Sequence, residues 1–194
     1  MDLMRCFPDN HFDLAIVDPP YGIGDFILSG TCRGSKFYRD LDKVDWDVKP
    51  NREYFSELKR VSKNQIIWGA NYFGFDATRC ILIWDKMQNF SGSDFELAYT
   101  SFDSPAKAFR MSRVEAYAGG KIHPTQKPIE LYRWILHNYA KPGDKILDTH
   151  LGSGSIAIAC HEKGLHLTGS EINANYFSLM QKRLSEVFAQ QVLI

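Results

Sequence analysis

A carboxylate, two prolines and an aromatic ring follow an apolar run in the segment IVDPPYGIG, residues 16–24. The run FDLAIV before Asp18 is short and rich in residues that favour strands, so it predicts a strand that ends at this acid. Pro19 and Pro20 fix their φ angles and stiffen the backbone beside it. Such a segment offers a hydrogen-bond acceptor and the ring of Tyr21 at the end of a strand. The alternative is a Pro-Pro turn with a core tyrosine.

A glycine-rich turn joins a strand to a helix in the segment KILDTHLGSGSIAIA, residues 145–159. The apolar strand ends at Asp148, and Gly152 and Gly154 let the backbone of the turn approach a ligand closely. The helix that follows begins with unpaired N–H groups that suit a negative group. Glu171 closes the next predicted strand about twenty residues later, where an acid can bind the hydroxyl groups of a ribose. The order of these features predicts a site for a cofactor that contains a nucleoside.

The turn narrows the choice of cofactor. It reads DTHLGSGS and lacks the third glycine of the fingerprint that holds a pyrophosphate, which disfavours a dinucleotide. S-adenosylmethionine fits better, because it carries ribose and adenine without phosphate and has a zwitterionic amino-acid end.

With HPTQKP at residues 123–128 as a third motif, the chain resembles the permuted, β-class S-adenosylmethionine-dependent DNA amino-methyltransferases of the DPPY type. The resemblance extends from Phe12 to about Leu184, with the catalytic motif before the cofactor motif. It implies an α/β fold: a single-domain, Rossmann-like methyltransferase sheet, circularly permuted, with helices on both faces.

The resemblance also implies a reaction. The family methylates an exocyclic amine of a base, and the Asp18 carboxylate and Pro19 carbonyl would accept hydrogen bonds from that amine. Pro20 would stiffen the motif, and Tyr21 would stack on a base flipped out of the duplex. We expect transfer to N6 of adenine in DNA, since an Asp opens the motif. A cytosine-N4 enzyme and a catalytically inactive binding subunit remain the alternatives.

The residues expected at the cofactor come from two segments of the chain. The turn and the strand after it contribute Asp148, Leu151, Gly152, Ser153, Gly154, Ser155, Glu171 and Ile172, and the HPTQKP segment contributes His123, Thr125 and Lys127. Lys127 could pair with the cofactor carboxylate. The chain departs from the family at Thr149 and His150, where proline and an aromatic residue are usual. It also lacks a further strand that in the family precedes the catalytic motif and ends in an acid facing the cofactor adenine. Either the C-terminal QQVLI supplies that strand, or the sequence is short of it.

Composition places the chain among ordinary globular proteins. It has 194 residues, 44% of them hydrophobic, with 23 basic and 23 acidic side chains. This usage excludes a disordered or fibrous protein, and the zero net charge argues against binding nucleic acid by bulk electrostatics alone. No apolar run approaches the roughly 20 residues that cross a bilayer, so we expect a cytoplasmic protein without membrane contact. The four cysteines are scattered, which favours free thiols and no metal site.

Strand-like and helix-like segments alternate along the chain and predict a parallel sheet covered on both faces. The predicted strands are 12–20, 64–69, 80–85, 96–102, 144–150 and 165–171, and the predicted helices are 50–63, 128–143, 154–164 and 173–190.

We expect one catalytic domain, 1–194, that binds DNA through two segments. A lid over 22–49 would carry Arg33, Lys36 and Arg39 to the phosphate backbone, because this stretch has turn-forming composition without periodicity. A short DNA-contact insert over 104–122 is rich in basic residues, for which a solvated helix or hairpin face is the alternative. The insert is too small for a separate recognition domain, which leaves room for a homodimer or a partner subunit.

Overall fold

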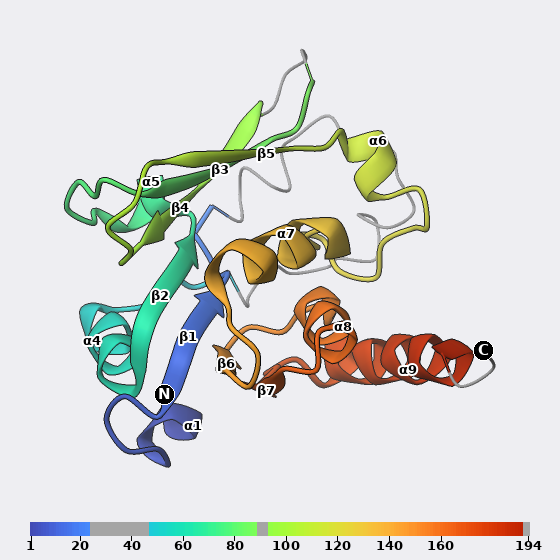
Figure 1. The fold of residues 1–194 in the computed structure, drawn as a ribbon. Helices are drawn as coiled ribbons and strands as arrows, with labels where there is room; N and C mark the ends of the chain where they lie inside the picture. Colours follow the sequence, from blue (N-terminus) through green and yellow to red (C-terminus); the bar gives the residue numbers. More distant parts are fainter. Residues whose placement is uncertain (24–46, 89–92, 192–194) are drawn as a thin grey trace.

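The computed structural model describes residues 1–23, 47–88 and 93–191. Within them a seven-stranded sheet has the order β5-β3-β4-β2-β1-β6-β7 (Figure 1). The strands are β1 (Phe12–Val17), β2 (Ser62–Trp68), β3 (Ile81–Asp85), β4 (Phe95–Thr100), β5 (Lys107–Arg110), β6 (Lys145–Asp148) and β7 (His166–Gly169). The expected lid over 22–49, with its three basic residues, lies outside the described residues except at its two ends.

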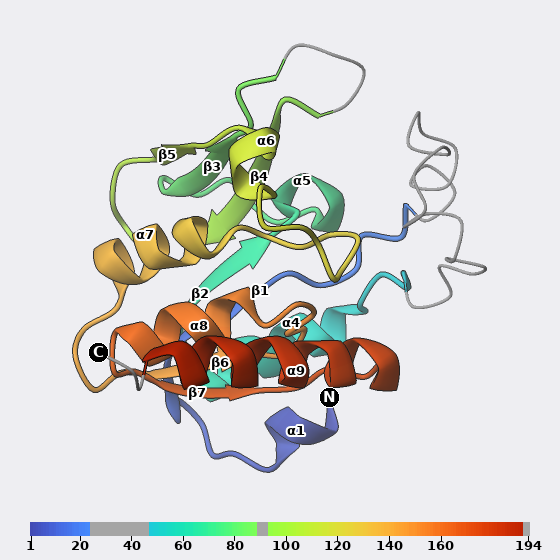
Figure 2. The same cartoon turned by 90° about the vertical axis from the view of Figure 1, so that its right-hand side faces the viewer.

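Helices cover both faces of the sheet, as Figures 1 and 2 show. The described helices are α1 (Asp2–Arg5), α4 (Arg52–Val61), α5 (Ala70–Phe73), α6 (Arg113–Ala116), α7 (Ile129–Tyr139), α8 (Ser155–Glu162) and α9 (Ala174–Gln191). One core packs α7 and α8 against the sheet, and a second packs α1 and α4 against the other face. The α/β single-sheet fold predicted from the sequence is therefore confirmed. No helix in the described ranges has the length and apolar character that a membrane crossing needs.

The sheet is not wholly parallel, in contrast to the alternation predicted from the sequence. Strand β4 runs antiparallel to both β2 and β3. The chain between β3 and β4 is short, and a parallel pairing would need a crossover of a dozen or more residues. Strand β5 was not predicted, because its four residues lie at the edge of the sheet with mostly exposed side chains and no apolar pattern. The first two residues of the C-terminal QQVLI belong to α9, and 192–194 lie outside the described residues.

The two motif-bearing strands are neighbours in the sheet. Strand β1 pairs in parallel with β6, with Leu14 opposite Ile146 and Ala15 opposite Leu147. From β1 the chain goes on to α4 on one face, and from β6 it enters α8 on the other. In open α/β sheets the carboxyl ends of two strands that diverge in this way flank the ligand crevice. The fold thus brings the DPPY segment and the glycine turn to one edge.

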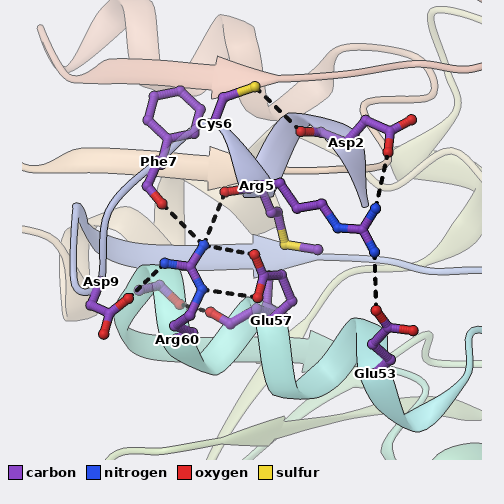
Figure 3. Close-up of polar contacts among 11 residues, drawn as sticks. Asp2, Arg5, Cys6, Phe7, Asp9, Glu53, Glu57 and Arg60 are labelled. Atoms are coloured by element: carbon purple, nitrogen blue, oxygen red, sulfur yellow. Dashed lines mark hydrogen bonds and ion pairs between the residues drawn. The ribbon is translucent and has the colours of Figure 1, made fainter.

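Arg60 of α4 fixes the N-terminal segment that leads into β1 (Figure 3). Its guanidinium donates to the carbonyl oxygens of Met4 and Phe7 at 3.3 and 3.0 Å. The same group contacts carboxylate oxygens of Glu57 and Asp9, each at 2.6 Å. Because a guanidinium presents five donors in a rigid fork, one side chain can hold a helix, a loop and two acids together.

We expect Arg60→Met to lower the melting temperature more than Arg79→Met does. The first change leaves Glu57, whose side chain is only 17% exposed, without its cation, and removes the donor to two carbonyl groups. The second removes a pair with Asp103 in which both side chains are largely exposed, and such pairs contribute little. Thermal unfolding followed by circular dichroism measures the melting temperature of both variants. Equal decreases would show that Arg60 stabilises the fold no more than an exposed ion pair does.

Candidate active site

Asp18 lies directly after β1 and both of its carboxylate oxygens are engaged. Oδ1 accepts a hydrogen bond from the Tyr21 hydroxyl at 2.5 Å, and Oδ2 accepts one from the Lys127 ammonium at 2.6 Å. The side chain is 12% exposed. Burial raises the pKa of Asp18, and the neighbouring Lys127 opposes that rise. The acid is thus removed from water and depends on two partners of its own chain.

Lys127 is shared between two acids. Its Nζ lies 2.6 Å from Asp18 and 2.8 Å from Glu96, and 5.3 Å from the centre of the Trp68 ring. Burial alone would lower the pKa of Lys127, but the two carboxylates raise it above the ordinary value, so the ammonium stays charged. The sequence led us to expect a pair with the cofactor carboxylate. The structure places this cation against Asp18, and the pair with the cofactor carboxylate stays a prediction.

Glu96 and Lys86 extend this arrangement, and sequence reasoning missed both. Lys86 Nζ lies 2.8 Å from Glu96, and Lys127 and Lys86 together lower the pKa of Glu96 to about 2 although burial opposes them. Lys86 follows β3 and Glu96 lies in β4. Because β3 and β4 pair antiparallel, the end of β3 lies beside the start of β4. A prediction that makes all strands parallel does not bring these two residues together.

Tyr21 is packed in an aromatic cluster. Its ring stacks on Tyr72 of α5 with centroids 4.7 Å apart and an angle of 14°, and the edge of Phe73 lies against it. The Asp47 carboxylate accepts hydrogen bonds from the backbone N–H groups of Tyr21 and Gly22, each at 3.0 Å. Of the two prolines before Tyr21, Pro19 is buried and Pro20 is half-buried. The stack identifies Tyr72 as a site residue, for which the sequence carries only a weak signal.

The glycine turn is held by Glu171 and by α9. Glu171 accepts hydrogen bonds from the N–H groups of Gly152 and Asn173, both at 2.8 Å. Arg183 of α9 donates to the Ser153 carbonyl at 2.9 Å and to the Ser155 hydroxyl. The acid expected to bind a ribose therefore also shapes the turn. Leu151 donates to the Ser170 carbonyl at 3.0 Å, Gly154 lies under Met180, and Ile172 is 94% exposed beside them.

Asp148 ends β6 and is buried with one oxygen unpaired. Oδ1 accepts a hydrogen bond from the backbone N–H of His150 at 2.9 Å, and Oδ2 has no hydrogen-bond partner among the described residues. Burial raises the pKa of Asp148 to about 8. A buried carboxylate oxygen without a donor is costly, so it marks a place where a ligand donor or cation can bind.

Thr149 and His150, the departures from the family pattern, form a small polar cluster beside Asp148. The Thr149 hydroxyl lies 2.6 Å from that of Tyr54 in α4 and 3.0 Å from Nδ1 of His150. Burial lowers the pKa of His150 to about 4, so its ring is neutral at physiological pH. The cluster packs the turn against α4 without adding a charge.

The HPTQKP segment spans the site. At one end the His123 ring lies 4.3 Å from the ring of Tyr176 and next to Gly152, and Thr125 contacts its Nδ1 at 3.2 Å. At the other end Lys127 reaches Asp18. Burial, with Lys121 and Lys127 nearby, lowers the pKa of His123 to about 4. One loop therefore connects the glycine turn to the DPPY acid. No group of acids, histidines and cysteines in the described part of the chain is arranged to hold a metal ion.

Comparisons with known proteins show the family of the chain. The N6/N4 DNA methylase family matches residues 83–182, more than half of the chain, and the protein belongs to this family. YubD of Escherichia coli strain K12, whose name describes it as a methylase, is 27% identical over 95% of this chain and 87% of its own. The type II methyltransferase M2.MboI of Moraxella bovis is 24% identical, with 96% and 85% covered.

Solved structures share the fold. M1.HpyAVI in complex with S-adenosylmethionine superposes with a TM-score of 0.60 at 19% identity, over 94% of this chain and 91% of that one. The cytosine-N4-specific PvuII DNA methyltransferase gives 0.61 at 13% identity, over 92% and 81%. TTHA0409 of Thermus thermophilus, complexed with S-adenosylmethionine, gives 0.59 at 17% identity, over 95% and 90%.

Gly69→Ala tests whether the position of Tyr21 matters. Gly69 has φ +78°, and a Cβ there would lie 2.3 Å from the Tyr21 ring. We expect a loss of about 1–2 kcal/mol in unfolding free energy from the backbone strain. Because the ring is also displaced, we expect a loss of roughly tenfold or more in methyl transfer to DNA.

Gly74→Ala is the matched control. Gly74 has φ +65°, and nothing lies within 4 Å of the added Cβ. It should lose similar stability yet keep methyl transfer. If both variants kept wild-type turnover, the observed position of Tyr21 would not matter for the reaction.

Proposed function

We propose that the protein is a permuted, β-class DNA methyltransferase of the DPPY type that methylates N6 of adenine. The observation that carries this proposal is the juxtaposition of two acids, Asp148 buried and Asp18 partly buried, at the carboxyl ends of neighbouring strands. Asp18 follows β1 and Asp148 ends β6, and the two strands are paired in parallel. An acceptor for an amine and an acid for a cofactor thus lie at the same edge of the sheet, where ligands of open α/β sheets bind. The order of the motifs, catalytic before cofactor, is the basis for the permutation.

S-adenosylmethionine is the methyl donor, and when bound it supplies a methyl group on a positively charged sulfonium. The residues present fit it. The unpaired Oδ2 of Asp148 suits the ammonium of its amino-acid end, and Glu171 lies where ribose hydroxyl groups are expected. The turn Leu151–Ser155, with Ile172, would border the nucleoside. His123 and Thr125 would border the amino-acid end, while the ammonium of Lys127 is already engaged by two acids.

The proposed role of Asp18 is to accept the target amine. The nitrogen lone pair of an exocyclic amine is delocalised into the base, so acceptors on its N–H bonds return electron density to it. The Tyr21 hydroxyl now donates to Oδ1, and an amine N–H would take its place. The Pro19 carbonyl would accept the second N–H, since the prolines fix its direction. After methylation the nitrogen is cationic, and its proton passes to Asp18 or to water.

The Tyr21 ring is proposed to stack on the flipped base. It is a flat surface beside Asp18, and it is now covered by Tyr72 at 4.7 Å. A base that reaches Asp18 must separate these two rings, so Tyr72 would form the opposite wall or move aside. Base flipping places the target in such a pocket.

DNA is the substrate, and we propose that the insert 104–122 contacts its backbone within a single catalytic domain, 1–194. The described insert contains β5 and α6. Lys121 in it donates to the Pro124 carbonyl at 2.8 Å, and burial lowers the pKa of this lysine to about 8. Lys107 contacts Asn138, and Arg110 contacts Asp85. Lys107 and Arg110 lie on the edge strand β5, and Lys121 lies in the loop that leads to the HPTQKP segment.

The choice of base is tested by product analysis. The purified protein is incubated with DNA and labelled S-adenosylmethionine, and the product is digested to nucleosides. N6-methyladenine supports the proposal, whereas N4-methylcytosine would replace it with the cytosine-specific alternative. Absence of transfer to any DNA, with cofactor still bound, would indicate an inactive binding subunit.

We expect Asp18→Asn to reduce methyl transfer by at least about a hundredfold, because an amide accepts a hydrogen bond less strongly and cannot take the proton. Cofactor affinity should stay within a few fold, since Asp148 and the glycine turn are unchanged. Radiolabel transfer and isothermal titration calorimetry measure the two effects. Retained turnover would contradict the role of Asp18.

Cofactor binding should depend on pH through Asp148. Its pKa of about 8 in the free protein means that it must lose a proton before it can pair with an ammonium. Between pH 8 and pH 6 we therefore expect affinity to weaken as pH falls, by up to roughly tenfold per unit. Asp148→Asn should bind weakly and without this dependence. A flat profile in the wild type would remove Asp148 from the amino-acid subsite.

A further inference from the structure

Four charged side chains from four parts of the fold form one continuous chain of ion pairs, all of them buried or partly buried. Lys86 contacts Glu96 at 2.8 Å, Glu96 contacts Lys127 at 2.8 Å, and Lys127 contacts Asp18 at 2.6 Å. Their side chains are between 4% and 24% exposed. The formal charges alternate and sum to zero. A neutral row of this kind keeps each ion paired although little water reaches it.

Glu96 holds the Lys127 ammonium on the side opposite Asp18. Strand β2 separates β4, which carries Glu96, from β1, which leads to Asp18. The Lys127 ammonium bridges this gap over the ring of Trp68 at the end of β2. Glu96 holds the ammonium from the far side, and Lys86 holds Glu96. Without Glu96, nothing in the described network would balance the pull of Asp18 on Lys127.

We infer that Glu96 is a positioning residue for methyl transfer: through Lys127 it sets how tightly the Asp18 carboxylate is bound, and Lys86 in turn holds Glu96. The inference rests on the proposed function, in which Asp18 accepts the target amine. A lysine paired with Asp18 alone would withdraw electron density from the acceptor that the amine needs. A lysine shared with Glu96 draws less on Asp18 and leaves the Asp18 carboxylate a better acceptor.

The charge environment of Asp18 predicts opposite effects for the two outer members. The titratable groups that face Asp18 are Lys127 and Glu96, Tyr21 on its own segment, Tyr54 of α4, Tyr117 after α6, Tyr132 of α7 and Asp148 of β6. The negative charge of Glu96 raises the pKa of Asp18, so its removal should lower that pKa. Removal of the positive charge of Lys86 should raise it, since Glu96 would then draw more on Lys127.

The test is the pH dependence of kcat/KM for methyl transfer in Glu96→Gln and Lys86→Met. The acid limb reports the ionisation of Asp18 in the free enzyme, since the acceptor must be ionised. We expect the limb to move to lower pH in Glu96→Gln and to higher pH in Lys86→Met, each by about half a unit or more. In Glu96→Gln the plateau rate should also fall several fold.

Two control variants remove ion pairs outside the network, in which the side chains are more exposed. Glu162→Gln breaks the two-bonded pair with Arg133, and Lys63→Met breaks the pair with Asp13. Both should keep the wild-type acid limb. A limb that stays in place in both network variants, or moves the same way in both, would overturn the inference, because a merely structural role cannot produce opposite shifts.

A readout without turnover separates this inference from the proposed function. Carbon-13 NMR of labelled aspartate carboxyl groups follows the titration of Asp18 in the ligand-free protein, with Asp18→Asn to assign the signal. Opposite shifts in an enzyme that transfers no methyl group would refute the proposed function and keep the electrostatic link. Glu96→Asp keeps the negative charge, so Asp18 should titrate closer to the wild type in this variant than in Glu96→Gln. Equal titration in the two variants would contradict the electrostatic link between Glu96 and Asp18.

Discussion

A single buried ammonium, that of Lys127, connects the parts of the site. A lysine removed from water is stable only if its charge is fully compensated, and here two carboxylates and an aromatic ring surround it. Those partners come from the end of β1, from β2 and from β4, so the strands must keep their order and register for the ion to be tolerated. The alignment of the sheet and the position of Asp18 are thus parts of one constraint.

The same loop also reaches the glycine turn. Residues 123–128 place His123 beside Gly152 and Lys127 beside Asp18. A ligand that moves the glycine turn would therefore also move residues 123–128. A movement of these residues would shift Lys127 against Asp18. Under the proposed function, one short segment therefore contacts both the cofactor side and the base side of the site. Burial keeps His123 neutral, so the loop adds charge only where two acids receive it.

Local sequence features predicted the parts of the site that are local in the chain. The apolar run before Asp18 and the strand–glycine–helix pattern after Asp148 each lie within a few residues, and both elements form as predicted. Glu96 and Lys86 could not be found in this way, because their meeting depends on an antiparallel pairing between β3 and β4. The stack of Tyr21 on Tyr72 likewise depends on which strands are neighbours. Pairing across the sheet is non-local, and no period within one segment encodes it.

The two acids on neighbouring strands are treated in opposite ways by the chain. Asp18 receives a cation from its own protein, whereas Asp148 is buried and one of its oxygens has no hydrogen-bond partner among the residues that the structure describes. An acid whose pKa in the folded state, about 8, lies above its unfolded value makes folding less favourable as pH rises between the two values. The ionised Asp148 therefore lowers the stability of the folded protein, and a positively charged ligand group beside it would restore that stability. If Asp18 receives a neutral base, its charge must be compensated by the protein itself, as Lys127 does. If Asp148 receives the positively charged group of a cofactor, the protein need not supply that partner.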